Sequence, residues 1–375
     1  MMTPLERFVR TMDYSNPDRV PNYEVGVWAQ TIQRWEREGL EPTELNWDFM
    51  TGEARFDMDP RQFIPVNYRM LPAFEPVLLE RTEHYEIIRN EWGMTVKELI
   101  DGSYMGARAS MGQYLKFPVE NAQDFQEIKK RFIASTPARY PAMWQQMLVP
   151  EWKARTVPLM LGNPTGMLGF YWRMREWMGT ENLSIAFFEQ PELIDDMCSF
   201  IADFTIEVSR PILKEITPDF IWISEDMAMK GAPLLGPETY RRFIYPHMKR
   251  LVEFMRGQGI RYVAVDSDGD PEQLMPLLMD AGVDTIWPLE RAAGVDPWKW
   301  RQKFGKSLRL WGGVDKRVLA RDKAAIDSHL AELQPLLADG GFIPSVDHLV
   351  PPDVSLENYL YYMERKQQML RRYGG

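Results

Sequence analysis

From Thr156 onward, short apolar segments of the chain alternate with stretches of helical pattern. These segments read VPLMLGNP, IWISEDM, YVAVDSD, TIWPLE, LRLWGGVD and FIPSVDH. Apolar runs of this length, separated by amphipathic stretches, indicate parallel strands joined by crossover helices. Two earlier candidate strands, near residues 22–27 and 62–67, bring the count close to eight. The sequence therefore predicts an α/β fold, a closed (β/α)8 TIM barrel.

The part of the chain before this repeat predicts a helix and an insertion. Thr3 is a hydroxyl cap followed by Pro4 and, three residues after the cap, by Glu6, which predicts a helix to about Tyr14. Residues 77–100 alternate polar and apolar side chains around turn sequences, which indicates an antiparallel hairpin inserted at about residues 74–100. This hairpin is either a lid over the site or a plug at the barrel end. We find no linker or repeat and expect one domain over residues 1–375.

Composition limits the possible partners. The chain has 44 Lys and Arg against 54 Asp and Glu, a net charge of −10, which disfavours binding to nucleic acid or to an anionic membrane. A single cysteine, Cys198, excludes an internal disulfide and a thiolate metal cluster. The sequence shows neither an apolar leader nor a membrane-spanning run, so we expect a cytoplasmic protein. The glycine pair Gly312 and Gly313 lacks the spacing of a phosphate-binding loop, so no bound nucleotide is expected.

Acidic residues stand where the predicted strands end. Asp266 and Asp268 are two positions apart, so both carboxylates face the same side if the strand continues that far. Close like charges raise the pKa of one group, or bind a cation or a cationic substrate. Asp270 and Asp296 each precede a proline and are predicted to cap helices.

Further candidate residues follow other strands. In a parallel barrel all the carboxyl ends of the strands meet on one face, so these side chains are expected in one acidic pocket. The candidate catalytic residues are His348, Asp266, Asp268, Asp226 and Glu225, and the candidate substrate-binding residues are Glu24, Trp28, Trp172, Trp222, Trp287, Glu290 and Asp347. Each acid can instead be a helix cap or an ion-pair partner, and each tryptophan either sandwiches a flat substrate or packs in the core.

Several segments together resemble the uroporphyrinogen decarboxylase superfamily over nearly the whole chain. They are PDRVPNYEVGVW, GPETYRRFIYPHMKRLVEFMRGQG, VDSDGDPEQLMPLLMDAGVDTIWPLE, LWGGVDKRVLA and FIPSVDHLVPPDVSLENYLYYME. The resemblance implies a TIM barrel with its site at the carboxyl ends of the strands. One branch of the superfamily decarboxylates the acetate arms of a porphyrinogen without a cofactor. Another branch transfers methyl groups between corrinoid proteins and small molecules, using zinc held by a His-x-Cys motif and a later cysteine.

The chain departs from both branches in its site residues. The decarboxylases carry an RQAGRY-type segment after the first strand, whereas this chain reads EVGVWAQTIQRW there, without the arginine pair. Only His348 matches the decarboxylase pattern. In the methyltransferase branch, the His-x-Cys motif falls on Asp266 and Asp268, and the late cysteine falls near His348. The resemblance thus implies a divalent metal on Asp266, Asp268 and His348, either zinc or a harder ion, because carboxylates and imidazole replace thiolates.

The methyltransferase branch is the nearer one, and it implies a specific activity. We expect O- or N-demethylation of a small molecule, with the methyl group passing to a corrinoid on a separate protein, because no DxHxxG cobalamin motif occurs here. The alternative is a cofactor-independent decarboxylase of a porphyrin-like or other acid. A third possibility is a binding protein without catalysis. Homodimers are common in the superfamily, so a homodimer is also possible.

Overall fold

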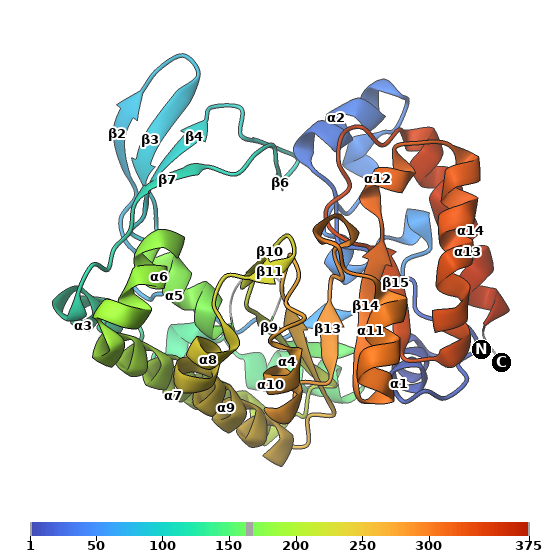
Figure 1. Ribbon diagram of the computed structural model, residues 1–375. Coiled ribbons are helices and arrows are strands. Elements are labelled where there is room, and N and C mark those ends of the chain that lie inside the picture. The colour runs from blue at the N-terminus through green and yellow to red at the C-terminus, as the bar shows by residue number, and fades with distance from the viewer. Residues whose placement is uncertain (1, 163–167, 374–375) are drawn as a thin grey trace.

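Seven parallel strands form the central sheet of the computed structural model, which describes residues 2–162 and 168–373. Their order is β1, β8, β9, β12, β13, β14, β15, and every pair of neighbours is parallel. The strands are β1 (Gln62–Phe63), β8 (Leu159–Leu161), β9 (Phe220–Ser224), β12 (Tyr262–Asp266), β13 (Thr285–Trp287), β14 (Arg309–Val314) and β15 (Phe342–Val346). The sheet curls as in a TIM barrel (Figure 1), which confirms the predicted fold class.

The eighth position of the barrel holds an extended segment, residues 22–27, in place of the regular strand predicted there. Only Val27 forms a bridge, with Val350, next to β15. Towards β1, the amide of Asp59 donates to the Asn22 carbonyl at 2.9 Å. Side chains take other backbone groups of the segment, because Asp59 accepts from the Asn22 amide at 2.7 Å and Arg61 donates to the Glu24 carbonyl at 3.0 Å. These side-chain contacts replace a regular strand ladder.

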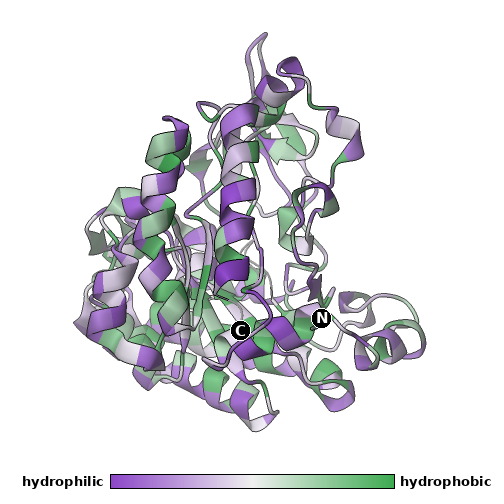
Figure 2. Ribbon diagram, turned by 90° about the vertical axis from the view of Figure 1, so that its right-hand side faces the viewer, coloured by the Kyte–Doolittle hydropathy of each residue, from purple (hydrophilic) through white to green (hydrophobic). Residues whose placement is uncertain are grey.

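Helices cover the outside of the sheet (Figure 1). The capping box predicted at Thr3 is present, with Thr3 and Glu6 bonding each other's backbone amides. Along many helices hydrophilic and hydrophobic residues alternate (Figure 2), as expected when one face contacts the sheet and the other contacts water. The helices are α1 (Pro4–Met12), α2 (Ala29–Arg37), α3 (Ala122–Lys129), α4 (Trp144–Lys153), α5 (Phe170–Met178), α6 (Thr180–Glu189), α7 (Pro191–Glu215), α8 (Pro237–Thr239), α9 (Tyr245–Gly257), α10 (Met275–Asp280), α11 (Pro297–Phe304), α12 (Lys316–Leu319), α13 (Lys323–Asp339) and α14 (Leu356–Arg372).

A second, antiparallel sheet stands apart from the barrel, above α5 and α6 (Figure 1). Its strands β2 (Val77–Arg81), β3 (Tyr85–Arg89), β4 (Thr95–Leu99) and β7 (Gln113–Lys116) lie in that order. Antiparallel strands therefore occur where the alternating sequence predicts them, but the insertion is larger than a hairpin because it continues to residue 116. We call these four strands the inserted sheet.

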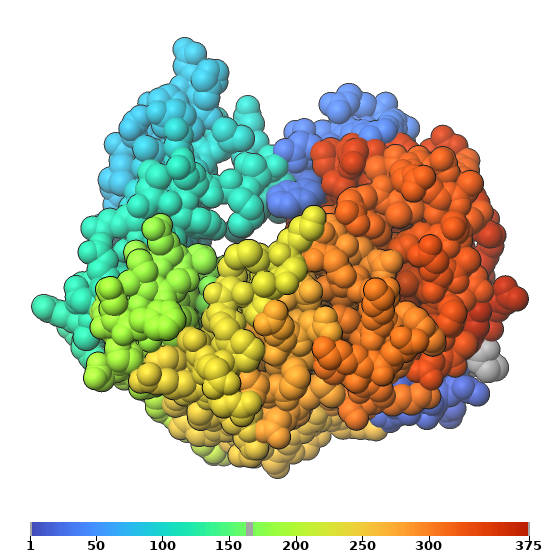
Figure 3. Space-filling model, in the orientation of Figure 1, coloured from blue at the N-terminus to red at the C-terminus, as the bar shows by residue number. Residues whose placement is uncertain are grey.

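Residues 100–112, which we call the strap, connect β4 to β7 and reach across to α2. The strap contains the short pair β5 (Ser103–Tyr104) and β6 (Ala107–Arg108). The Tyr104 hydroxyl donates to Glu36 at 2.7 Å, and the Gln30 side chain donates to the Ala109 carbonyl at 2.5 Å. A hollow lies beneath the inserted sheet and the strap (Figure 3).

Aromatic side chains fill the barrel interior. Trp222 lies 5.3 Å from both Trp287 and Trp311, measured between ring centroids, and Phe8 of α1 packs on Phe220 at 5.1 Å. The interior is therefore a packed core, and space for a ligand is left at the carboxyl ends of the strands.

Within residues 2–162 and 168–373, no helix is both long and apolar enough to cross a membrane.

Candidate active site at the barrel mouth

The carboxyl ends of β9, β12 and β15, which we call the barrel mouth with their neighbours, bring several predicted residues together. Asp266 ends β12 and stands in register with Ser224 of β9. The loops that follow carry Asp226, Asp268 and His348, and the charges of Asp268 and His348 both act on the pKa of Asp226. Residues that are far apart in sequence therefore share one electrostatic environment, as the strand pattern predicts.

Asp268 and His348 form a close pair at this mouth. The His348 Nε2 lies 3.3 Å from Asp268 Oδ2, with the two side chains 29% and 35% exposed. The second oxygen of Asp268 is buried and has no hydrogen-bond partner in the described part of the chain. Burial alone would lower the pKa of His348, but the hydrogen bond and charge of Asp268 raise it above the ordinary value. The His348 ring also stacks on Trp28, with centroids 6.2 Å apart.

Asp226 forms a second pair, with Arg175 of α5. The Arg175 guanidinium contacts the Asp226 carboxylate and also donates to the Asp226 carbonyl at 3.1 Å. It lies 4.7 Å from the Trp172 ring. Asp226 has a φ of 41°, in the left-handed region that a non-glycine residue seldom adopts. Burial raises the pKa of Asp226, and Arg175 opposes this rise.

Asp266 lies deeper than the other acids, with 7% of the residue exposed. Burial raises its pKa well above the ordinary value, and the charges of Asp268 and Asp226 add to the rise. Among the residues that the structure describes, no three or more His, Cys, Asp or Glu side chains are arranged to hold a metal ion. Asp268 and His348 meet, but Asp266 does not complete a ligand set with them. These residues therefore do not fit the three-ligand metal site that the family resemblance implies.

Glu225 follows β9 but serves the start of α5. Its carboxylate accepts from the backbone amides of Phe170 at 3.0 Å and Tyr171 at 2.7 Å. Burial raises the pKa of Glu225 to about 7, and these amides oppose the rise. The Glu225 side chain therefore caps the start of α5, which is one of the two alternatives stated for each strand-end acid.

Asp347 and Glu290 tie the loops of the mouth to one another. Asp347 is fully buried and accepts from the amides of Arg291 at 2.8 Å and Lys316 at 3.1 Å. Glu290 pairs with the Lys316 ammonium at 2.8 Å and accepts from the Gly269 amide at 3.1 Å. Both acids hold the loops after β12, β13 and β14 in place around the mouth.

Two of the four predicted tryptophans lie in the core and two flank the mouth. Trp222 and Trp287 are buried at 0% and 5% exposure inside the barrel. Trp28 stacks on His348, and Trp172 lies against Arg175. The remaining predicted residue, Glu24, is 1% exposed and pairs with Lys366 at 2.6 Å.

The two capping predictions differ in outcome. Asp296 caps α11 by accepting from two backbone amides. Asp270 does not cap α10, which begins at Met275. It accepts from the Glu272 amide at 3.1 Å, within a turn that precedes this helix.

A cavity of about 870 Å³ lies between the inserted sheet and the barrel mouth. The inserted sheet forms one wall through β3, β4 and β7, and Trp172, Arg175 and Asp226 line the other side. A cavity of this size holds a small organic molecule. The structure thus adds Arg175 to the predicted residues of the site.

Sequence reasoning missed Arg175 and Lys316. Arg175 lies in α5, and its partner Asp226 is 51 positions away in the sequence, so no local pattern connects the two. Lys316 carried a signal, because it directly follows the strand-end sequence GGVD.

Comparison with known proteins yields a family, two relatives and a structural neighbour. The family model of uroporphyrinogen decarboxylase (URO-D) matches residues 114–369. Uroporphyrinogen decarboxylases from two strains of Thermus thermophilus are 28% identical over 144 residues, which is 36% of this chain and 38% of theirs. The match therefore spans well under half the length of these relatives.

A solved structure, a methyltransferase from Methanosarcina mazei, superposes with a TM-score of 0.60. It is 14% identical, and the match covers 98% of this chain and 99% of that one. At this identity the likeness shows the fold alone. Because the family model covers more than half of the sequence, from the inserted sheet to α14, the chain belongs to the uroporphyrinogen decarboxylase family.

Proposed function

We propose that this chain removes a methyl group from a methoxylated or N-methylated small molecule and transfers it to a reduced corrinoid on a separate protein. The observation that carries the proposal is the Asp268–His348 pair at the barrel mouth, with Nε2 and Oδ2 3.3 Å apart. The fold shared with the Methanosarcina mazei methyltransferase is compatible with it. We place the chain in the cytoplasm, where its one thiol, Cys198, stays reduced.

The reaction needs an acid that protonates the leaving group, and the Asp268–His348 pair can supply it. An ether oxygen leaves poorly unless a proton neutralises the charge that develops on it. Asp268 stabilises the protonated His348 ring through Nε2, so Nδ1 is the nitrogen that presents a proton to the leaving atom. The carbon–oxygen bond breaks, the oxygen takes this proton, and the methyl group passes to the reduced corrinoid, which supplies the electron pair.

The cavity under the inserted sheet supplies the binding surface in this proposal, and Asp226 connects it to the pair, because Asp226 lines the cavity and senses the charges of Asp268 and His348. Its volume of about 870 Å³ suits a small flat molecule, and Trp172 and Asp226 lie on its barrel side. The Trp28 ring packs on His348 and restricts the imidazole orientation. Arg175 holds the Asp226 carboxylate and so fixes the acid at the cavity wall.

Decarboxylation is the second candidate, and the family match favours it. The matching family model and both Thermus thermophilus relatives carry the name uroporphyrinogen decarboxylase. His348 would then donate its proton to the carbon that loses carbon dioxide. Against a porphyrinogen substrate stands the segment after Gly26, which reads VWAQTIQRW and lacks the arginine pair of those enzymes.

Corrinoid methylation separates the two candidates. The protein is mixed with cob(I)alamin and with methoxylated aromatic compounds or N-methylated amines, and the conversion of cobalt(I) to methylcobalt(III) is followed by absorbance. We expect methylation with at least one donor and a loss of about 10²–10⁴-fold in rate for His348→Gln. His84→Gln, in an exposed turn of the inserted sheet, is the matched control and should retain the rate. Carbon dioxide release without corrinoid methylation would replace the proposal with the lyase.

A further inference from the structure

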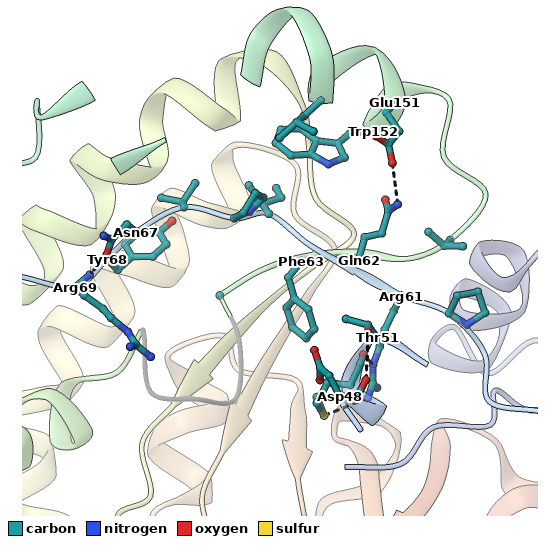
Figure 4. Close-up of a pocket in the computed structure, with 18 residues that line it drawn as sticks. Asp48, Thr51, Arg61, Gln62, Phe63, Asn67, Tyr68, Arg69, Glu151 and Trp152 are labelled. Atoms are coloured by element: carbon teal, nitrogen blue, oxygen red, sulfur yellow. Dashed lines mark hydrogen bonds between the residues drawn. The ribbon is translucent and has the colours of Figure 1, made fainter. Parts of the chain in front are cut away.

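A second cavity, of about 960 Å³, lies beside β1. Figure 4 shows its residues, with Arg61 next to Asp48 and Thr51, and Gln62 turned the other way towards Glu151. Much of the lining is apolar and comes from Phe63, Ile64, Val66, Leu148, Val157 and Trp152. Arg69 lines both this cavity and the one under the inserted sheet, so the two adjoin.

Arg61 is a buried cation in this lining, with 2% of the residue exposed. Its Nε donates to the Met50 carbonyl, and its Nη2 donates to the Glu24 carbonyl at 3.0 Å. The guanidinium lies 4.3 Å from the Tyr23 ring and 5.2 Å from the Trp311 ring. Among the described residues, its Nη1 is buried without a hydrogen-bond partner, and no carboxylate forms an ion pair with the guanidinium, although the charges of Asp48, Glu24 and Asp59 act on its pKa.

Two other buried arginines, Arg7 and Arg139, are bonded more completely than Arg61. Arg7 pairs with Asp18 and Asp59 at 2.9 and 2.7 Å. Arg139 lacks a carboxylate, but Nε, Nη1 and Nη2 all donate to backbone carbonyls. A buried guanidinium without a counter-ion and with an unused nitrogen is costly, so such groups are normally paired. Arg61 thus has the features of a group whose partner comes from outside the chain.

We propose that this cavity binds the carboxylate of a small organic acid, with Arg61 as the charged donor through Nη1. A guanidinium fits a planar carboxylate through charge-assisted hydrogen bonds. The apolar lining suits the hydrocarbon part of such an acid. Asp48 and Glu151 also line the cavity, so a ligand with two negative charges meets more repulsion than a monoanion does. The aromatic faces of Tyr23 and Trp311 pack on the Arg61 guanidinium and hold it in this position.

Binding is measured without turnover, so this inference is independent of the proposed reaction. The probes are benzoate and its neutral analogue benzamide, titrated by calorimetry and by thermal shift into the wild-type protein. We expect benzoate to bind at least about tenfold more tightly than benzamide, since the amide oxygen is neutral and accepts a weaker hydrogen bond from the guanidinium than a carboxylate does. Equal affinity for the two probes would overturn the proposal, and so would tighter binding of inorganic phosphate than of benzoate.

Variants assign the binding to Arg61. Arg61→Met should lose the preference for benzoate, and Arg61→Lys should reduce it because the planar fork is gone. Arg34→Met is the control with the same change in net charge, since Arg34 is a half-exposed residue of α2 paired with Glu38. His348→Gln should bind benzoate as the wild type does, so that failure of the proposed reaction is separable from failure of this site. If Arg61→Met does not fold, the Lys variant decides: an unchanged preference there contradicts the assignment.

Discussion

The barrel closes where the segment 22–27 meets β15 and α14, and we call this region the closure. The charged residues at the closure and those at the barrel mouth differ in how completely their polar atoms are hydrogen-bonded. At the closure, both Glu24 oxygens are used: Oε1 binds Lys366 and the Tyr362 hydroxyl, each at 2.6 Å, and Oε2 accepts from the Val346 amide at 2.9 Å. At the mouth, the Asp268 carboxylate pairs with His348, and its second oxygen has no hydrogen-bond partner among the described residues.

The difference separates structural from functional charge. A buried ion pair that uses all its hydrogen-bonding capacity fixes the geometry of the fold. A charged group with unused capacity costs stability, and such groups are typical of sites that bind or react. Glu24 was predicted to bind substrate, yet by this criterion it belongs to the closure. Asp268 Oδ1, at the mouth, and Arg61 Nη1, beside the closure, are buried atoms of charged side chains that have no hydrogen-bond partner among the described residues.

The largest effect is expected on activity at the mouth. Asp268→Asn removes the charge that stabilises protonated His348, so the rate of methyl transfer should fall by about 10²-fold or more. The unfolding free energy should change by less than about 1 kcal/mol, because the pair is partly exposed. Corrinoid methylation rates and urea denaturation measure the two effects. A large loss of stability with an unchanged rate would mean that the Asp268–His348 pair stabilises the fold and takes no part in the reaction.

The second effect is expected on stability at the closure. Lys366→Met leaves the Glu24 carboxylate buried without its counter-ion and should lower the unfolding free energy by about 3–5 kcal/mol. Urea denaturation gives this value. The double variant Glu24→Gln with Lys366→Met should recover part of the loss, since no uncompensated charge is left. A loss below about 1 kcal/mol in the single variant would mean that the ion pair at the closure contributes no more to the unfolding free energy than the pair at the mouth does.

A smaller, pH-dependent effect is expected at Arg175. Arg175→Met leaves the Asp226 carboxylate without its cation and should cost about 1–3 kcal/mol at pH 8. Burial already raises the folded-state pKa of Asp226 above its unfolded value, and loss of Arg175 raises it further. The folded state then holds the proton more tightly than the unfolded state does. Stability therefore falls as the pH rises from the unfolded-state pKa of Asp226 through its higher folded-state pKa.

The deficit of Arg175→Met should therefore shrink towards pH 4, where Asp226 is protonated in more of the folded molecules. Denaturation of the variant and the wild type at a series of pH values measures this. Arg250→Met, which removes an exposed cation paired with Asp203, should show no such trend. A deficit of Arg175→Met that grows on acidification would contradict this account of Asp226.

The smallest effect is expected at the strap. Tyr104→Phe removes the hydrogen bond to Glu36 and should change the unfolding free energy by about 0.5–1.5 kcal/mol at most. Limited proteolysis should nevertheless cut residues 100–112 faster in the variant, because one of the two hydrogen bonds between the described residues of the strap and α2 is lost. Tyr85→Phe, which removes a similar bond to Glu80 within the inserted sheet, is the control. Equal cleavage rates would show that the strap is held by other contacts.

The sequence predicts the strands of the barrel well because each is a continuous apolar run. It predicts poorly what depends on pairing between distant side chains. The segment 22–27 looks like the other strands, but Asp59 and Arg61 bond its backbone in place of a neighbouring strand. Glu225 follows β9 just as Asp226 does, and only the position of α5 shows that it caps a helix. The position of an acid at a strand end therefore predicts its neighbourhood and not its partner.

The closure of the barrel also constrains the order in which the molecule assembles. The bonds from Glu24 to Val346, Tyr362 and Lys366 join residues between 322 and 342 positions apart. During synthesis, the segment around Glu24 leaves the ribosome long before α14 is made, so its carboxylate has no buried partner until then. Contacts of such long sequence separation form slowly. We therefore expect nascent chains that end before α14 to keep this segment accessible and to depend on chaperones.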